Sequence, residues 1–317
     1  VEYQSAVALN ALLLCGAVLL IGAIGTQLFG APVGALASWI AALYPPFLYY
    51  STRPMREVML VFMGTLLLYA VLNFRFTVVA VIAAAAALTN TTFIPFSAGI
   101  VPIFLAWRRK SFVGSVIYLL IFFSLYSLWP LRNFARFGTL VVGSTAGAGT
   151  IFYTNQILEP EQTCTASEPV ILHADPVYRE GAAITDRVAQ EKFFWKAGWA
   201  KVFERPGTYL RKVLWRFADL WRVLPRERGY DHDTKLVRLA AMLSDGWILP
   251  IGLLGLVLSR LRPLEASALP LFVFALNLPV AMVFSSLRYR LPAMPAVILF
   301  CAYALWRLSG DWKRRRA

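Results

Sequence analysis

The sequence contains few charged residues, few cysteines and few histidines. Asp, Glu, Lys and Arg make up only 15% of its 317 residues, whereas a soluble domain has about a quarter. This composition excludes a disordered chain, because disordered chains are rich in charge and poor in apolar residues. The chain has three cysteines and two histidines, and it contains no Cys-x-x-Cys motif. Neither a disulfide-stapled scaffold nor a zinc site is therefore expected. We therefore expect no metal and no cofactor.

The common motifs of nucleotide-binding proteins and hydrolases are also missing. The chain has no P-loop, no GxGxxG, no GxSxG and no HExxH, so it lacks the usual signals of ATP-driven transport, nucleotide binding and hydrolysis. Asp231-His232-Asp233 could form a metal cluster, but three adjacent side chains need a special turn to point at one ion. We favour an acidic turn that caps the next helix, with the metal cluster as the alternative.

Long apolar runs dominate the sequence instead. Hydrophobic residues make up 59% of the chain and the mean hydropathy is +0.62. A membrane-spanning helix needs about 20 apolar residues. Nine runs are candidate spans: Ser5–Gly30, Pro32–Tyr50, Glu57–Leu72, Thr77–Leu88, Thr92–Trp107, Phe112–Trp129, Trp247–Leu258, Ala268–Ser285 and Leu291–Trp306. We therefore predict an all-α polytopic integral membrane protein with about nine transmembrane helices.

Two features predict breaks in this series of helices. The fourth and fifth runs are short and are separated only by Thr89-Asn90-Thr91, so they form either two tilted helices or one re-entrant hairpin. Proline removes a backbone donor and clashes with the preceding turn. Pro45-Pro46 and the pair Pro292 and Pro295 are therefore expected to break or tilt helices near one membrane face.

The net charge of +14 is explained better by membrane orientation than by binding to nucleic acid. Lys and Arg concentrate in the cytoplasmic loops of membrane proteins. One predicted side carries eleven cations against the two acids Glu265 and Asp311: Arg75, Arg108, Arg109, Lys110, Arg260, Arg262, Arg307, Lys313, Arg314, Arg315 and Arg316. This side is assigned to the cytoplasm together with the C-terminus. Val1 then lies outside, so we expect a further helix to precede it in the whole protein.

The topology divides the chain into three parts. Residues 1–130 are predicted to hold the N-terminal transmembrane helices, residues 131–245 an extracytoplasmic, mostly helical loop region with amphipathic helices, and residues 246–317 the C-terminal transmembrane helices and a basic cytoplasmic tail. Within the loop region, Thr139–Gly149 and Gln156–Glu180 are expected to be irregular because Gly, Ser, Thr and Pro are frequent there.

Two amphipathic helices are predicted in the rest of this loop region. Apolar residues share one face between Ile184 and Val202, and again after Pro206-Gly207 between Leu210 and Leu224. The other face of the second helix is basic, with Arg211, Lys212, Arg216 and Arg222. Such a pattern is typical of a helix that lies in the membrane interface. A helix packed on a small outer domain fits the pattern equally well.

Three clusters of charged residues lie at the predicted outer ends of spans, although Lys and Arg usually concentrate on the cytoplasmic side. They are Arg53, Arg56 and Glu57 between the second and third spans, Arg132-Asn133 after the sixth, and Arg288-Tyr289-Arg290 before the ninth. Guanidinium groups match a phosphate bidentately, so the clusters indicate an anion held near the outer leaflet. Arginine side chains that reach for lipid headgroups are the alternative.

Four segments, in the same order along the chain, resemble a known family. They are residues 43–69, with a Tyr/Ser turn before an acidic residue; residues 128–156, with Pro-x-x-Arg-Asn leading into a Gly- and Ser-rich loop; residues 204–221, a Pro-Gly amphipathic helix; and residues 287–305, with Arg-Tyr-Arg-x-Pro. Together they are similar to the GT-C superfamily of polytopic glycosyltransferases, in a bacterial branch that includes protein mannosyltransferases and lipid A aminoarabinose transferases.

The resemblance implies a cell-envelope glycosyltransferase of the bacterial inner membrane. It would pass a sugar from a polyprenyl-phosphate donor to a lipid, glycan or protein acceptor on the extracytoplasmic face, among membrane lipids and without nucleic acid. The resemblance implies that the donor phosphate is held by Arg132, Arg288 and Arg290, supported by Tyr289 and Asn133, and that the displacement inverts the sugar while a carboxylate deprotonates the acceptor. Arg53 and Arg56 would position substrate. The resemblance names no protein partner.

The sequence also departs from the family. The family's acidic motif follows its first span, which would precede Val1, so the expected base is not in this sequence. Glu57 is a candidate base, but a structural or substrate-positioning role is favoured. The Leu-Thr-Arg-Pro turn of relatives is here Leu88–Thr91, which lacks the arginine. The alternative function is therefore a non-catalytic GT-C-like subunit that scaffolds or binds within a larger membrane complex. A transporter is disfavoured because no internal repeat is visible and the spans hold almost no charge.

Overall fold

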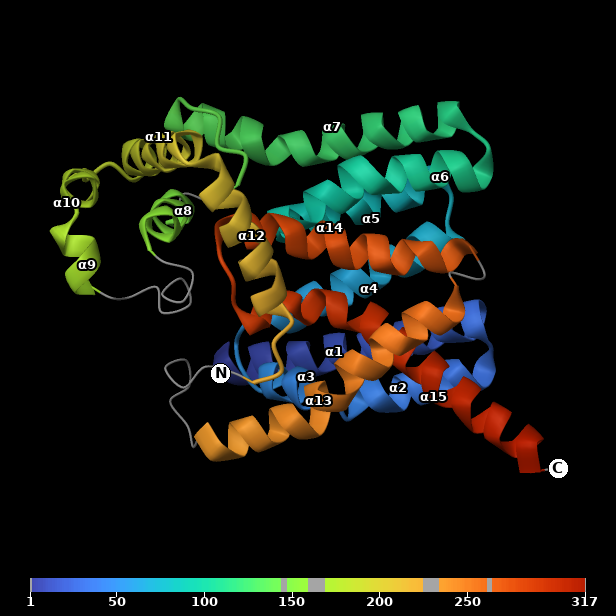
Figure 1. Ribbon diagram of the computed structural model, residues 1–317. Coiled ribbons are helices and arrows are strands. Elements are labelled where there is room, and N and C mark those ends of the chain that lie inside the picture. The colour runs from blue at the N-terminus through green and yellow to red at the C-terminus, as the bar shows by residue number, and fades with distance from the viewer. Residues whose placement is uncertain (1, 144–146, 159–168, 225–233, 261–263, 317) are drawn as a thin grey trace. The chain divides into compact units, whose positions relative to one another are not determined.

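The computed structural model describes residues 2–143, 147–158, 169–224, 234–260 and 264–316 (Figure 1). Within these ranges the regular structure is entirely helical, without a strand, which confirms the predicted all-α class. The chain forms two compact units. Unit 1 comprises Val1–Leu125, Arg222–Asn277 and Arg288–Ala317, and unit 2 comprises Tyr126–Trp221 and Leu278–Leu287. The predicted three-part division concerns the sides of a membrane, so it stays a prediction.

Six helices in the described residues are long and apolar enough to cross a membrane: Tyr3–Phe29, Thr91–Arg109, Phe112–Phe137, Lys235–Ser259, Glu265–Val283 and Leu287–Gly310. The pair α2 (Ala31–Ala42) and α3 (Pro45–Ser51), bent by 53°, makes a seventh if it counts as one span. The protein is therefore a multi-pass membrane protein. The α4 (Glu57–Asn73) and α5 (Phe76–Thr89) helices are apolar but shorter, so the count of nine stays a prediction.

Unit 1 is built from most of these helices. Besides α2 to α5, its elements are α1 (Glu2–Phe29), η1 (Thr91–Phe93), η2 (Pro95–Ile100), α6 (Val101–Arg109), α13 (Thr234–Ser259), η4 (Leu264–Ser267), η5 (Leu287–Ala293) and α15 (Met294–Arg316), with parts of α7 (Phe112–Phe137) and α14 (Ala268–Val283). In Figure 1, α1 runs beside α2, and α13 crosses α15.

Proline and asparagine stand at the helix boundaries of unit 1 where the sequence predicts breaks. Pro45 and Pro46 stand at the start of α3, directly after the bend. The α5 helix ends at Thr89, and the Asn90 side chain then accepts a hydrogen bond from the Thr92 backbone N at 3.0 Å. This bond caps η1 and separates the fourth and fifth predicted spans into two helices.

Glycines allow two pairs of helices in unit 1 to approach closely. A Cβ atom on Gly25 of α1 would lie 2.9 Å from the Gly34 Cα of α2. On α13, a Cβ atom on Gly255 would lie 1.9 Å from the carbonyl oxygen of Phe300 on α15. Small residues at crossings are the usual way in which membrane helices gain packing contacts, because lipid provides little hydrophobic drive for association.

Unit 2 contains the end of α7 together with α8 (Ala148–Ile157), α9 (Pro169–Ala174), α10 (Pro176–Ala182), α11 (Arg187–Glu204) and α12 (Pro206–Leu220). The α8 and α11 helices pack together (Figure 1). Gly149 of α8 donates its backbone N–H to Glu191 Oε2 of α11 at 2.6 Å, and the Phe152 ring stacks on Trp195. An aromatic core and one buried carboxylate thus join the two helices.

The prediction of irregular structure over Gln156–Glu180 is wrong for its described C-terminal part, which forms α9 and most of α10. Pro169 and Pro176 begin these helices, because a first helical position needs no backbone N–H and favours the φ of proline. Asp175 caps α10 by accepting a hydrogen bond from the Tyr178 backbone N at 2.8 Å. Cys164 and the Asp231-His232-Asp233 sequence lie outside the described residues.

The second amphipathic helix is present as α12, but part of its basic face is buried. Lys212 Nζ donates to the carbonyl oxygens of Gln156 and Leu158, at 3.0 and 2.6 Å, and Arg216 Nη2 donates to that of Asn155 at 2.6 Å. These carbonyls lie at the C-terminal end of α8, where cations are stabilised. The two side chains therefore cap α8, whereas Leu210 and Leu214 are exposed.

The hydroxyl of Tyr153 is expected to stabilise unit 2 in a pH-dependent way. It donates to Asp175 Oδ1 at 2.9 Å, and burial together with Asp175 raises the pKa of Tyr153 above its ordinary value of 10.0. Tyr153→Phe is expected to lower the free energy of unfolding by about 1.5–3 kcal/mol at neutral pH. Because the folded-state pKa is the higher one, this contribution is complete below pH 10.0 and is lost as the pH rises through the folded-state value.

The measurement is thermal unfolding of wild type and Tyr153→Phe from about pH 8 to about pH 11. The difference between the two proteins should narrow at the alkaline end. The matched control is Tyr178→Phe, which removes a half-buried phenol hydroxyl from the same unit and should destabilise the protein less. A difference that stays constant across this pH range would contradict the assignment.

Candidate functional site

Unit 1 contains a buried ion pair between Arg290 and Asp245. Arg290, on η5, is only 2% exposed, and its Nη2 donates to Oδ2 of Asp245 on α13. The other carboxylate oxygen of Asp245 accepts a 2.5 Å hydrogen bond from the Tyr44 hydroxyl, and Arg290 Nη1 donates to the Arg222 carbonyl at 2.6 Å. The carboxylate therefore joins three segments that are far apart in the sequence.

The local sequence explains how Tyr44 reaches this carboxylate. Tyr44 precedes Pro45, and a residue before proline is held out of the helical region. Its backbone is accordingly extended, which interrupts the path between α2 and α3, and its ring packs edge-on against Phe47 with centroids 4.9 Å apart. The side chain is therefore fixed at the bend of the broken helix pair.

A second pair of opposite charges, Arg288 and Glu57, is partly open to solvent. Arg288 Nη1 lies 3.9 Å from Glu57 Oε1, and the two side chains are 43% and 10% exposed. The other terminal nitrogen of Arg288, Nη2, donates to the Tyr289 hydroxyl at 3.1 Å, and its guanidinium carbon lies 5.0 Å from the Tyr289 ring centroid. Glu57 is the first residue of α4, where the helix dipole stabilises a carboxylate.

Arg53 and Arg56 lie on the turn that leads into α4. The Arg53 guanidinium stacks over the Tyr49 ring at 4.4 Å. Asn10 of α1 donates from Nδ2 to the carbonyl oxygens of Arg53 and Met55, at 2.7 and 3.1 Å, and so fixes the turn. Arg56 is exposed directly before Glu57. The structure thus brings the first and third predicted clusters together through the contact between Glu57 and Arg288.

The second predicted cluster belongs to the other unit. Arg132 and Asn133 lie on the part of α7 in unit 2. Arg132 stacks over Trp129 at 5.0 Å and donates from Nη1 to Asn133 Oδ1 at 3.0 Å. Asn133 is buried and donates from Nδ2 to the Val141 carbonyl at 3.0 Å. Asn133 therefore ties the end of α7 to the segment that follows it.

Sequence reasoning missed Asp245 and Tyr44 as partners of Arg290. Asp245 was assigned to the end of the long outer loop, whereas the structure places it inside the apolar helix that begins at Thr234. An acid within a candidate span is a signal in itself, because ionisable groups in membrane helices are costly and need a partner. A longer hydropathy window around Asp245 would have exposed that signal.

The chemistry available at these pairs is that of guanidinium, carboxylate and phenol groups. Among the described residues, His, Cys, Asp and Glu side chains form no group of three or more that could hold a metal. Arg288 keeps enough exposed surface to take an anion, and Glu57 beside it can accept a proton or orient the guanidinium. No family model, curated protein or solved structure matches the chain.

Proposed function

We propose that the protein is a membrane glycosyltransferase that moves a sugar from a polyprenyl-phosphate donor to a lipid, glycan or protein acceptor. The observation that carries this proposal is the half-exposed Arg288 guanidinium beside the buried carboxylate of Glu57. A guanidinium binds phosphate oxygens bidentately, and partial shielding from water strengthens that attraction. The resemblance to the GT-C superfamily along the chain supplies the class of donor.

In this proposal Arg288 and Arg290 have different roles. Arg288 binds the donor phosphate with the Tyr289 hydroxyl beside it, while Arg290, already paired with Asp245, holds η5 in place. The acceptor hydroxyl attacks the anomeric carbon, the bond from that carbon to the phosphate oxygen breaks, and the lipid phosphate leaves as an anion. The hydroxyl proton passes to a carboxylate, for which Glu57 is the candidate within unit 1.

The proposed topology agrees with this chemistry. The nine spans count α4 and α5 as short spans, which a membrane accommodates by local thinning. The C-terminus lies in the cytoplasm, and the region between the spans Phe112–Phe137 and Lys235–Ser259 lies outside the bacterial inner membrane, following the distribution of Lys and Arg. The Arg288 and Glu57 pair then lies at the extracytoplasmic ends of its helices.

Removing the Arg288 charge is expected to weaken donor binding at least tenfold. The loss of one charge-assisted phosphate contact is worth about 1.5–3 kcal/mol, which corresponds to a factor of ten or more in affinity. Full-length protein in maltoside detergent would be titrated with undecaprenyl phosphate, and binding would be followed by native mass spectrometry. Arg288→Lys keeps the charge but not the fork, so we expect an intermediate affinity.

The matched control is Arg75→Gln, because Arg75 is an exposed arginine just beyond the other end of α4. It should bind undecaprenyl phosphate like wild type. Equal binding by wild type and Arg288→Gln would refute the phosphate role. Binding that depends on Arg288, without transfer from any polyprenyl-phosphate sugar, would favour the non-catalytic membrane subunit.

A further inference from the structure

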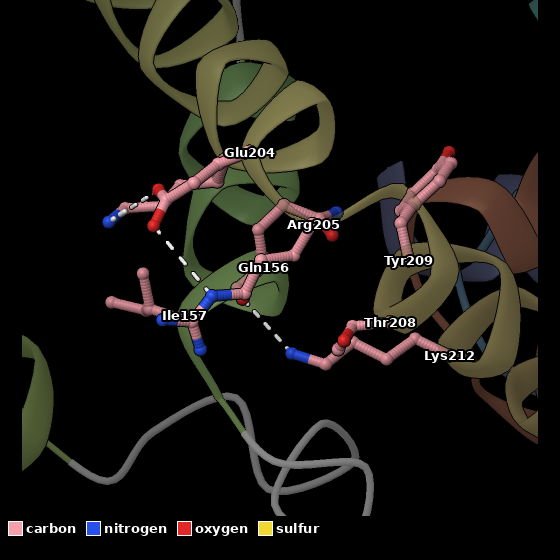
Figure 2. A pocket seen from close by; sticks show the side chains of 8 residues that line it. Gln156, Ile157, Glu204, Arg205, Thr208, Tyr209 and Lys212 are labelled. Atoms are coloured by element: carbon pink, nitrogen blue, oxygen red, sulfur yellow. Dashed lines mark hydrogen bonds and ion pairs between the residues drawn. The ribbon is translucent and has the colours of Figure 1, made fainter.

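Unit 2 contains a polar pocket of about 280 Å³, and Arg288 is not among the residues that line it (Figure 2). It lies where α11 ends and α12 begins, beside the C-terminal end of α8. Its lining residues come from these three helices and the link between two of them: Gln156, Ile157, Lys201, Glu204, Arg205, Thr208, Tyr209 and Lys212. Its volume is near the lower limit for small-molecule pockets, about 300 Å³.

The pocket carries more positive than negative charge. Three cations, Lys201, Arg205 and Lys212, face one carboxylate, that of Glu204. The Glu204 carboxylate lies 3.6 Å from Lys201 Nζ and 3.7 Å from Arg205 Nε; Figure 2 shows Glu204 and Arg205 at the edge of the pocket. Because one carboxylate offsets a single positive charge, the lining keeps a formal charge of +2, which favours an anion.

Buried basic groups add to this positive potential. Lys212 is only 4% exposed and donates hydrogen bonds to the carbonyl oxygens of Gln156 and Leu158. The fully buried Arg216 lies close to Tyr209. Burial raises the pKa of Tyr209, and Arg216 opposes that rise. Basic side chains therefore lie both at the rim of the pocket and beneath it.

The first turn of α12 borders the same space. Thr208 and Tyr209 line the pocket from this turn, and Pro206 stands at its start. The first backbone N–H groups of a helix have no intrahelical acceptor and carry a partial positive charge, which makes them good ligands for phosphate. A Cβ atom on Gly207 would have no neighbour within 4 Å, so no other part of the protein covers that side of the turn.

We propose that this pocket binds the phosphate group of a small polar molecule. The Arg205 and Lys201 cations and the start of α12 hold the phosphate, and Gln156 and Thr208 offer hydrogen bonds to neighbouring hydroxyl groups. The phosphate can come from a soluble phosphate ester or from a lipid headgroup. This proposal does not depend on the glycosyltransferase function, because none of its residues belongs to unit 1.

The test is a calorimetric titration of the full-length protein in maltoside detergent with glycerol 3-phosphate. Arg205→Gln and Lys201→Gln are each expected to weaken binding at least tenfold. Both side chains are exposed, at 75% and 44%, so neither substitution should prevent folding. The matched control is Lys196→Gln, an exposed lysine earlier on α11, which should bind like wild type. Unchanged binding by both pocket variants would overturn the proposal.

Two further measurements separate the possible outcomes. Glycerol, which matches the probe but lacks the phosphate, should not bind; equal binding of glycerol would overturn the proposal. Glycerol 3-phosphate should also slow acetylation of Lys201 but not of Lys196, and equal acetylation rates with and without the probe would count against it. Phosphatidylglycerol in mixed micelles should compete with the probe if a lipid headgroup is the source, whereas a lack of competition identifies a soluble phosphate ester.

A variant of the first site distinguishes this proposal from the glycosyltransferase proposal. Arg288→Gln should leave the binding of glycerol 3-phosphate unchanged, because Arg288 belongs to unit 1. Loss of glycerol 3-phosphate binding in Arg288→Gln would assign the binding to the first site and overturn the pocket. Lys212→Gln is not a useful test because Lys212 also caps α8.

Discussion

Replacing Asp245 with alanine is expected to lower the free energy of unfolding by about 3–5 kcal/mol. The substitution leaves the Arg290 guanidinium buried without its carboxylate, and it removes the acceptor of the Tyr44 hydroxyl. A buried cation that loses its opposite charge keeps a large desolvation penalty, so the loss exceeds that of a typical surface ion pair. Unfolding in detergent, followed by circular dichroism, measures the effect.

A double replacement separates the charge effect from loss of packing. Asp245→Leu combined with Arg290→Met removes both charges while keeping apolar volume, and such replacements are often neutral or stabilising. We expect the double variant to recover most of the stability that Asp245→Ala loses. Equal destabilisation by the single and double variants would show that packing, and not charge pairing, governs this position.

Placing a side chain on Gly255 is expected to force α13 and α15 apart. Even the alanine Cβ would lie 1.9 Å from the Phe300 carbonyl oxygen, and no change of rotamer can move a backbone atom. Gly255→Val is therefore expected to cost about 3 kcal/mol, at the upper end of the usual range for overpacking. Unfolding in detergent, followed by circular dichroism, measures this loss. On heating, the variant should also unfold at a lower temperature than wild type.

Gly246 provides a matched control on the same helix. A Cβ atom there would have its nearest neighbour at 3.9 Å, which is ordinary contact. Since alanine favours a helix over glycine by about 0.8–1 kcal/mol, Gly246→Ala should be neutral or stabilising. Equal stability of Gly255→Val and Gly246→Ala would contradict the prediction, because it would show that the backbones of α13 and α15 are not in contact at Gly255.

The candidate membrane-spanning helices could be predicted because their signals are local. Apolar runs of sufficient length, and the break at Pro45-Pro46, depend on residues adjacent in the sequence. The burial of Lys212 and Arg216 could not be predicted in the same way. It depends on the C-terminal carbonyls of α8, more than 50 residues away, which those cations cap.

The candidate site was predicted in pieces but not as a whole. Arg288 and Glu57 each stood out as charges at the ends of predicted spans, yet 231 residues separate them, and no spacing rule connects them across that distance. The sequence predicts that Arg290 binds phosphate. In the structure Arg290 pairs with Asp245, which the sequence places at the last position of the predicted loop region. Partner choice is a tertiary property, and it depends on how the helices pack.

The two partners of Asp245 are synthesised at different times. Tyr44 is made 201 residues before Asp245, whereas Arg290 is made 45 residues after it. At about 5–20 residues per second, the acid waits about 2–9 s for its cation. Of the two partners seen in the folded protein, only the Tyr44 hydroxyl has been made during that interval. A ribosome that stalls in that interval leaves Asp245 in an apolar helix without the Arg290 guanidinium.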